Sequence, residues 1–150
     1  MSMTTPDPSQ RQEWMGLLAR APAGRLAALM PSPLPPHDVL RAPEVGAVMV
    51  RGRTGATGAP FNLGEMTVTR CSLRLADGSV GHAWVQGRDK DHARRAAIAD
   101  ALLQGPLAAQ TRANLLDPLA AEETTRRATR AAKAAATKVE FFTLVRGEDQ

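Results

Sequence analysis

The chain has 150 residues and a formal net charge of +4, from 19 lysines and arginines against 15 acidic residues. This length is typical of one domain and argues against a multidomain protein. No run of 18 or more apolar residues occurs, and the first residues carry neither a basic start nor an apolar stretch. The sequence therefore indicates neither a transmembrane helix nor a signal peptide, and we expect a cytoplasmic protein.

The apolar residues supply little bulk for a core. Of the 65 apolar residues, 27 are alanine. Leucine, isoleucine, valine and phenylalanine together number 29, about 19% of the chain. Because the net charge is small and several segments are strongly patterned, we expect a folded chain that gains stability by burying faces against partners.

The cysteine and histidine content argues against a metal site within the chain. The single cysteine, Cys71, cannot form an internal disulfide, and the histidines at 37, 82 and 92 have no spacing typical of zinc ligands. Cys71 alternates with Thr69 and Leu73 on one face of a predicted strand. This pattern favours a buried structural thiol over a reactive one.

The first predicted element is a short amphipathic helix over residues 10–21, after a disordered N-terminus over residues 1–8. Ser9 and Gln12 have the spacing of a capping box, and apolar residues follow at helical spacing until Pro22. Apolar residues between 26 and 30 indicate one or two further helical turns. The prolines of segment 31–36 then favour an extended linker within the domain.

Antiparallel strands are predicted from residue 39 to residue 86. Apolar and β-branched residues recur there at period two, which is typical of strands. Asp77 and Gly78 predict a tight turn, since a two-residue hairpin turn needs positive φ at its centre. Segments 66–76 and 80–86 should therefore pair directly.

Two helices and a last strand are predicted in the remaining sequence. Asp89 is a plausible cap for a helix over 89–103, and Asp117 followed by Pro118 fits the start of a helix over 118–137. The apolar segment 138–145 predicts a final strand that joins the sheet. The expected fold class is α+β, with a single domain over 9–150 in which an antiparallel sheet packs with amphipathic helices.

Residues Arg88, Lys90 and His92 are the first candidates for binding an anion. They surround the start of the helix over 89–103, where backbone amides and the helix dipole favour negative charge. Two other interpretations stay open. Asp89 and Asp91 can supply the negative charge internally, and an isolated histidine is commonly a surface or capping residue.

Arg51 and Arg53 are a second set of candidates for binding an anion. They lie beside the glycine-rich segment RGRTGATG, whose amides and guanidinium groups suit a phosphate or phosphonate oxygen. The segment lacks the lysine and the following helix of a phosphate-binding loop. An ordinary hairpin connection, for which glycine and threonine are equally typical, is the alternative interpretation.

The predicted long helix and the C-terminal segment are candidates for a partner interface. Alanines repeat at helical spacing on one side of the helix and basic residues lie on another. A solvated basic face with helix-promoting alanines is the alternative, and non-specific nucleic-acid binding is the most that this face would support. The candidate interface residues are Ala128, Ala132, Phe141, Phe142 and Leu144.

Residue spacing alone assembles no nucleophile, base and oxyanion site, so it indicates only a small α+β protein that works with partners. Four segments in this order resemble the PhnG family of the bacterial carbon–phosphorus lyase system. They are RQEWMGLLARA, GATGAPFNLGEMTVTR, ADGSVGHAWVQGRDKDHARRAAIADALLQ and VEFFTLVRGED. The similarity spans about residues 9–149.

The resemblance implies a role in organic phosphonate breakdown. Members of this family are subunits of a two-fold symmetric core complex with PhnH, PhnI and PhnJ, and they act with PhnH, PhnI and PhnL in the first committed step. In that transferase reaction a phosphonate displaces adenine from C1′ of ATP, which gives α-D-ribose 1-methylphosphonate 5-triphosphate. The resemblance implies no cofactor of the chain's own, ATP as substrate and an iron–sulfur cluster in the PhnJ-like partner.

The resemblance assigns no catalytic residue to this chain, which should be inactive in isolation. Two alternatives remain from the residues themselves. One is a basic nucleic-acid-associated protein without enzymatic activity, and the other is a self-contained enzyme acting on phosphate esters. A steep salt dependence of nucleic-acid affinity would identify the first of these.

Overall fold

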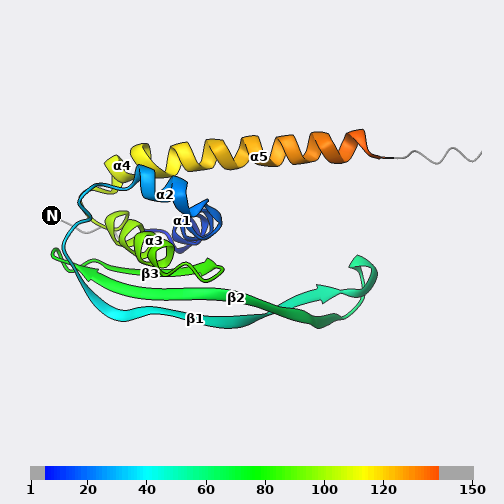
Figure 1. Cartoon of the computed structure of the whole chain (residues 1–150), viewed down its shortest axis with the longest axis horizontal. Helices are drawn as coiled ribbons and strands as arrows, with labels where there is room; N and C mark the ends of the chain where they lie inside the picture. The colour runs from blue at the N-terminus through cyan, green and yellow to red at the C-terminus, as the bar shows by residue number, and fades with distance from the viewer. Residues whose placement is uncertain (1–5, 139–150) are drawn as a thin grey trace, which may run out of the picture.

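The structure, a computed structural model, describes residues 6–138. Its three strands, β1 (His37–Arg53), β2 (Pro60–Leu75) and β3 (Val80–Gln86), form an antiparallel sheet in the order β1-β2-β3. The helices α1 (Pro8–Arg20), α2 (Ala23–Leu29) and α3 (Lys90–Leu102) lie on one side of this sheet, as Figure 1 shows. This arrangement confirms the predicted α+β class.

The core surrounds α3, with one part between this helix and the sheet and the other part against α1, α2 and residues 115–119. Period-two alternation buries Cys71 and Leu73 of β2 and Val85 of β3, while the side chains of His82 and Trp84 point the opposite way and are exposed. The side of α3 against the sheet is mostly alanine, which lets the two backbones approach closely. This layer of small side chains has the low bulk that the composition indicated.

The hairpin between β2 and β3 lies at the predicted position, but the predicted two-residue turn is wrong. Leu75 pairs with Ser79, so the loop has three residues, 76–78, and of Asp77 and Gly78 only the glycine has a positive φ. The amide of Leu75 donates to Ser79 at 2.9 Å and that of Gly78 donates to Leu75 at 3.0 Å, and Gly78 has a φ of +89°. Asp77 accepts from the amide of Ser79 at 2.9 Å. The positive φ explains why glycine occupies this position.

The start of α1 differs from the predicted capping box. Asp7, not Ser9, caps the helix, because its side chain accepts from the Ser9 amide at 3.2 Å and Pro8 occupies the first helical turn. The hydroxyl of Ser9 also donates to Asp7, at 2.6 Å, and the two hydrogen bonds lower the pKa of this carboxylate. The helix therefore begins two residues before the predicted residue 10, whereas α2 confirms the further turns predicted near residues 26–30.

The predicted start of the long helix at Asp117 is wrong. The chain is already helical in α4 (Ala108–Thr111), continues through a π turn, η2 (Arg112–Leu116), and enters α5 (Asp117–Ala136) without a cap. Pro118 has no amide hydrogen and its ring conflicts with the carbonyl one turn earlier. We attribute the widened π turn before it to this conflict, which the helix accommodates without ending.

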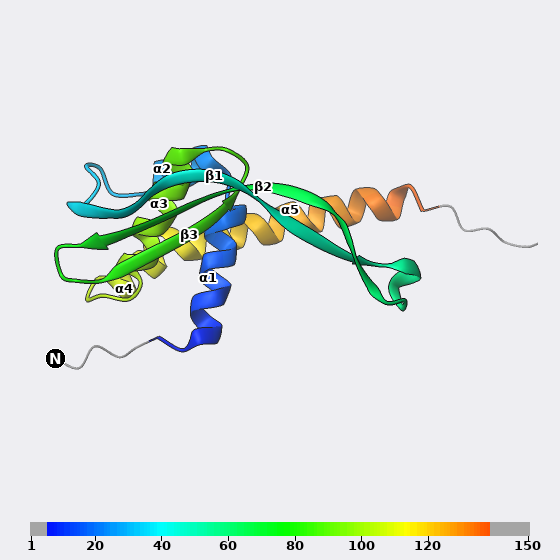
Figure 2. The same ribbon diagram turned by 90° about the horizontal axis from the view of Figure 1, so that it is seen from below.

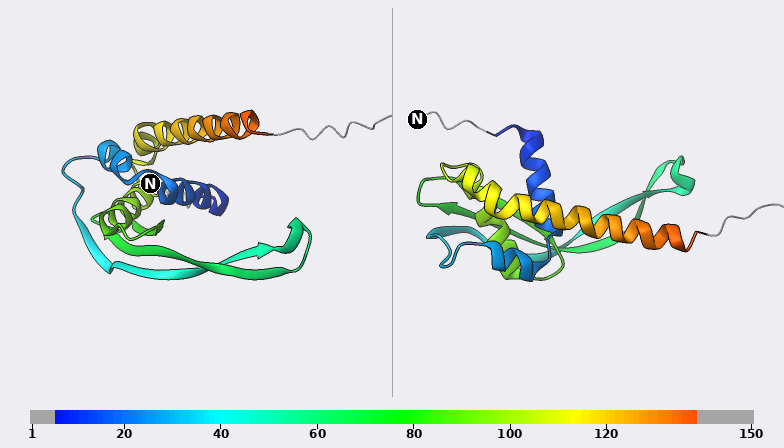
Figure 3. Two further views of the ribbon diagram at one scale, coloured as in Figure 1. Left: turned by 45° about the vertical axis from the view of Figure 1, so that its right-hand side comes forward. Right: turned by 90° about the horizontal axis from the view of Figure 1, so that it is seen from above.

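Two arms extend from the body of the molecule. The first, the hairpin arm, is residues 48–66, where β1 and β2 continue past the end of β3, which pairs only with Val68–Arg74. The second, the helical arm, is residues 124–138, and every residue in it is exposed. Figures 1 and 2 show both arms projecting to the same side of the body, and the left view of Figure 3 shows that α5 stands clear of the sheet.

The predicted final strand over 138–145 lies outside the described residues, apart from Lys138. The candidate interface residues Phe141, Phe142 and Leu144 lie outside them as well.

The first turns of α5 attach it to the body. Leu119 is completely buried, Glu123 pairs with Arg20 of α1 at 2.7 Å, and Glu122 pairs with Arg25 of α2 at 2.7 Å. The hydrogen bond from Arg20 is the main reason that the pKa of Glu123 lies below its usual value. The carboxylate therefore stabilises the folded state only while it is ionised.

We expect Glu123→Gln to lower the free energy of unfolding by less than about 1 kcal/mol at pH 7, because the pair is partly solvated. A lowered pKa in the folded state means that this contribution is complete above the unfolded pKa of about 4.3 and is lost as the pH falls below it. Urea unfolding of wild type and variant should therefore differ at pH 7 and converge in acid. Glu13→Gln is the control, since Glu13 forms no ion pair within the described residues. An equal loss of stability for both variants at pH 7 would contradict the role of the Glu123–Arg20 pair in attaching α5 to the body.

Candidate functional site

The corner between β3 and α3 carries the first predicted anion-binding residues. Gly87 turns the chain with a φ of +89°, and its amide donates to Thr67 at 2.9 Å. Asp89 caps α3 by accepting from the His92 amide at 2.9 Å. Arg88 and Lys90 are exposed on either side of this cap, and neither forms an ion pair with any residue from 6 to 138.

The structure turns His92 away from this corner. Its side chain points into the core, the residue is only 4% exposed, and its Nε2 lies 2.9 Å from the carbonyl oxygen of Leu18 in α1. A carbonyl can only accept, so Nε2 carries the proton and donates. The ring therefore joins α3 to α1, and of the three residues predicted here only Arg88 and Lys90 face solvent.

Arg51 and Arg53 lie in the hairpin arm, separate from the corner. Gly87 bonds to Thr67, which pairs with Ala47, and Arg53 is six residues further along β1. At about 3.3 Å per residue this places the Arg53 backbone roughly 20 Å from the corner. The two predicted sets of cations therefore do not form one site within a single chain.

The glycine-rich segment beside these arginines is the tip of the hairpin arm. It includes the short helix η1 (Thr54–Ala56), in which Gly55 has a φ of +59°. A Cβ on Gly58 would lie 2.7 Å from the Thr54 carbonyl oxygen, so glycine is needed for the chain to close. Arg53 donates to the Gly58 carbonyl at 3.3 Å. This geometry is that of an ordinary hairpin connection.

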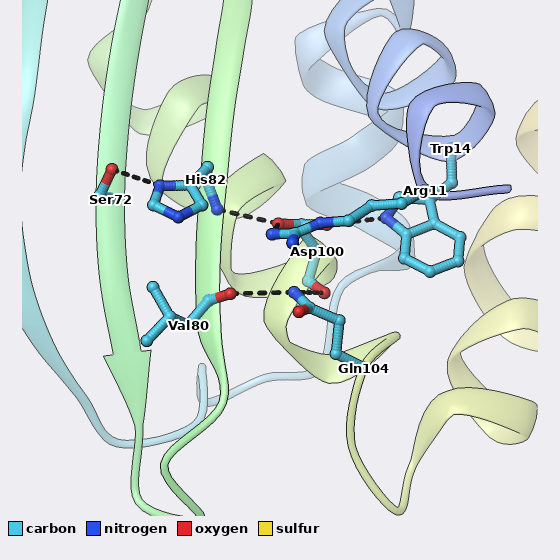
Figure 4. Close-up of polar contacts among 7 residues, drawn as sticks. All are labelled: Arg11, Trp14, Ser72, Val80, His82, Asp100 and Gln104. Carbon is cyan, nitrogen blue, oxygen red and sulfur yellow. Dashed lines mark hydrogen bonds and ion pairs between the residues drawn. The ribbon is translucent and has the colours of Figure 1, made fainter. Parts of the chain in front are cut away.

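A buried carboxylate that the sequence analysis missed connects α1, α3 and β3. Asp100 is completely buried and accepts from both Nε and Nη2 of Arg11, at 3.2 and 2.8 Å, and from Nε1 of Trp14 at 2.8 Å. It also accepts from the backbone amide of His82 at 2.9 Å. Figure 4 shows these donors converging on Asp100 from α1 and β3. These four hydrogen bonds compensate for burying the carboxylate of Asp100, which would otherwise be very costly.

This cluster does not form a catalytic triad, although it contains serine, histidine and aspartate. Ser72 Oγ lies 2.7 Å from Nδ1 of His82, but Asp100 accepts from the backbone amide of His82 and not from its ring. The carboxylate therefore cannot orient the imidazole as a triad requires. The cluster fixes the helices on the sheet and supplies no activated nucleophile.

Comparison with known proteins assigns the family. The model of the family described as phosphonate metabolism protein PhnG matches residues 9–147. The chain belongs to the PhnG family. A protein of Rhizobium meliloti (strain 1021), alpha-D-ribose 1-methylphosphonate 5-triphosphate synthase subunit PhnG, is 46% identical over 143 residues, which cover 94% of this chain and 92% of the relative. The resemblance drawn from sequence motifs is therefore confirmed.

Cys71 of this PhnG-family chain is a structural residue, as predicted. It is 1% exposed, and burial raises the pKa of its thiol. A neutral buried thiol is a poor nucleophile. Between residues 6 and 138, no group of three or more histidine, cysteine, aspartate or glutamate side chains lies close enough to hold a metal ion. Within the same residues, no helix combines the length and apolar character needed to span a bilayer.

The helical arm of this PhnG-family chain displays the alanines and the basic residues together. Ala128 and Ala132 are exposed, as are Arg126, Arg130 and Lys133. Arg127 pairs with Glu123 at 3.3 Å, and the helical arm itself contains no acidic residue. The arm is therefore a basic helix with no cover from the described part of its own chain.

Proposed function

We propose that this chain is a subunit of an enzyme complex that joins a phosphonate to the ribose of ATP and releases adenine. The observation that carries the proposal is the 46% identity, over nearly the whole of both chains, to a protein named as a subunit of alpha-D-ribose 1-methylphosphonate 5-triphosphate synthase. In this reaction a phosphonate oxygen forms a bond to C1′, the bond from C1′ to adenine breaks, and the triphosphate stays on C5′.

The proposed partners are PhnI-like, PhnH-like and PhnL-like subunits for this step, and a PhnJ-like subunit with an iron–sulfur cluster for later cleavage of the carbon–phosphorus bond. The two arms support an assembly of this kind. The last turns of α5 are exposed in the described part of the chain, so they gain little from tertiary packing, and a two-stranded hairpin is marginal in water. Both arms gain stability when a partner covers them.

The exposed cations of the chain suit the negative charge of the reactants. Methylphosphonate and the triphosphate of ATP are both anions, so an enzyme that brings them together must offset their repulsion. Arg88 and Lys90 offer two exposed cations at one corner, with no ion pair to other described residues. We propose that these two residues attract the anionic reactants, while PhnI-like and other partners supply the reacting groups.

Co-expression of this chain with the PhnI-like, PhnH-like and PhnL-like subunits tests the function. A tag on the PhnI-like subunit should retain this chain, and the purified mixture should release adenine from ATP only when methylphosphonate is present. Preparations that lack this chain should release none. Full adenine release without this chain would contradict the proposal. Salt-sensitive binding of DNA or RNA by the free chain, with no retention by the PhnI-like subunit, would favour the nucleic-acid-associated alternative.

We expect the double change Arg88→Gln and Lys90→Gln to reduce phosphonate-dependent adenine release at least about tenfold, because two charge-assisted contacts are lost. The complex should still assemble with normal stoichiometry. The matched control is Arg88→Lys with Lys90→Arg, which keeps both charges and should retain most activity. Full activity of the glutamine variant, or loss of activity only through failed assembly, would remove the anion-binding role.

A further inference from the structure

The two edges of the sheet differ in how their backbone groups are satisfied. At the β3 edge, Asp100 accepts from the His82 amide at 2.9 Å, and the side-chain amide of Gln104 donates to the Val80 carbonyl at 2.9 Å. Figure 4 shows both side chains placed along this edge. Asp100 of α3 and Gln104, which follows this helix, therefore occupy two of the groups through which another strand would pair with β3.

The hydrogen bonds of β2 show which groups of β1 face outward. The Thr67 carbonyl accepts from Gly87, on the β3 side, so Thr67 does not bond to β1. Its partner in β1 is Ala47, whose amide and carbonyl must then point away from β2. Since strands alternate, Val45 and Met49 point the same way. Within residues 6–138, no hydrogen bond from another element reaches these outward groups.

The open part of β1 also lacks the features that usually block an edge. Residues 45–50 read VGAVMV, with no charge and no proline. Pro43 and an irregular pairing with β2 lie just before this stretch, and a register shift lies just after Val50. A regular, uncharged edge of this kind is a template for pairing with another strand. Side chains thus occupy part of the β3 edge, whereas the β1 edge is open over residues 45–50 in the described part of the chain.

We propose that residues 45–50 of β1 pair with an extended segment of a partner subunit, which adds a fourth strand to the sheet. The occupant should be uncharged where it faces VGAVMV and acidic at the end that lies beside Arg51 and Arg53. Neither arginine has an ion-pair partner within the described residues. This inference rests on the proposed function, because the partner strand belongs to the same assembly.

Hydrogen exchange of the full chain, alone and in the co-purified complex, tests the pairing. The amides of Val45, Ala47 and Met49 should exchange freely in the isolated chain and slow by on the order of 100-fold in the complex. The amides of Gly46, Val48 and Val50 already bond to β2, so their exchange should change much less. Unchanged exchange at 45, 47 and 49 in an intact complex would overturn the pairing and leave the proposed function standing.

Ala47→Pro provides an independent test. Proline removes the outward amide and leaves the bonds to β2 intact, so the variant should fold, and its retention by the PhnI-like subunit should fall at least tenfold. Ala47→Val keeps the amide and should be retained normally. Met49→Lys, which places a charge on the edge, should weaken retention even if the proline variant misfolds.

Normal retention of both Ala47→Pro and Met49→Lys would overturn the inference. Protection of the same three amides in the free chain at high concentration would assign the edge to a second copy and also overturn it. Failure of the wild-type chain to join the partners would contradict the proposed function, and this pairing with it.

Discussion

Asp100→Ala should lower the free energy of unfolding by about 3–5 kcal/mol, the largest effect we expect from a single substitution in this chain. The change leaves the Arg11 guanidinium, the Trp14 indole and the His82 amide without their shared acceptor. Each donor then stays buried or partly buried without a hydrogen bond, which costs more than the bond itself contributed. Urea unfolding of the full chain, followed by circular dichroism, measures this loss.

Two other substitutions serve as controls for the Asp100 prediction. Asp100→Asn keeps one acceptor oxygen and should cost less than the alanine change. Asp38→Ala removes an exposed carboxylate that pairs with Arg74 at 3.5 Å, and it should cost less than about 1 kcal/mol. A loss below about 1.5 kcal/mol for Asp100→Ala would show that the cluster does not hold the helices on the sheet.

Gly81→Ala should destabilise the chain by about 3 kcal/mol through overpacking. A Cβ at this position of β3 would overlap the Ala97 carbonyl oxygen and lie 2.9 Å from the Ala101 nitrogen, both in the backbone of α3. Backbone atoms cannot rotate away as a side chain can, so the helix would have to move off the sheet. The glycine thus permits the close contact on which the alanine-rich core depends.

Gly46→Ala is the matched control for Gly81→Ala. Gly46 is also a strand glycine, but a Cβ there would meet nothing within 4 Å. The alanine change should be neutral or stabilise the chain by up to about 1 kcal/mol, since glycine loses more conformational freedom on folding. Equal losses for the two variants in urea unfolding would contradict the account of the core.

Local chemistry made several elements predictable from the sequence. The hairpin at Asp77 and Gly78 and the cap at Asp89 depend on residues close in the chain, and the structure contains both, although the hairpin loop has three residues where two were predicted. The same holds for the burial of Cys71, which followed from strand alternation. These features are set by neighbours within a few residues, so a single sequence suffices to find them.

Features that depend on distant residues were not predictable in this way. His92 lies in the first turn of a helix, yet its ring bonds to Leu18, which is far away in sequence. The donors to Asp100 are likewise distant from it in sequence. A carboxylate within the apolar run AAIADALL was nevertheless a signal that a buried acceptor was present. At Pro118, the residue pair typical of a helix start was overridden by a helix already formed before it.

The Arg88 and Lys90 corner shows the limit of inference from one chain. The sequence correctly placed two cations at the start of α3, and the structure leaves both exposed. In the proposed assembly, the groups that these two cations face belong to other subunits. The contacts of the two arms likewise cannot be read from this chain, because the arms are exposed in the part of it that the structure describes.

Limited digestion with trypsin, of the free chain and of the co-purified complex, tests most directly that partners cover the arms. Trypsin cleaves after arginine and lysine, and the helical arm offers Arg126, Arg130 and Lys133 while the hairpin arm offers Arg51 and Arg53. Cleavage needs local unfolding, which is easiest where few contacts hold the backbone. We predict that the free chain is cut first within the two arms and that the complex resists cleavage at both. Equal rates of cleavage within both arms in the free chain and in an intact complex would contradict the account.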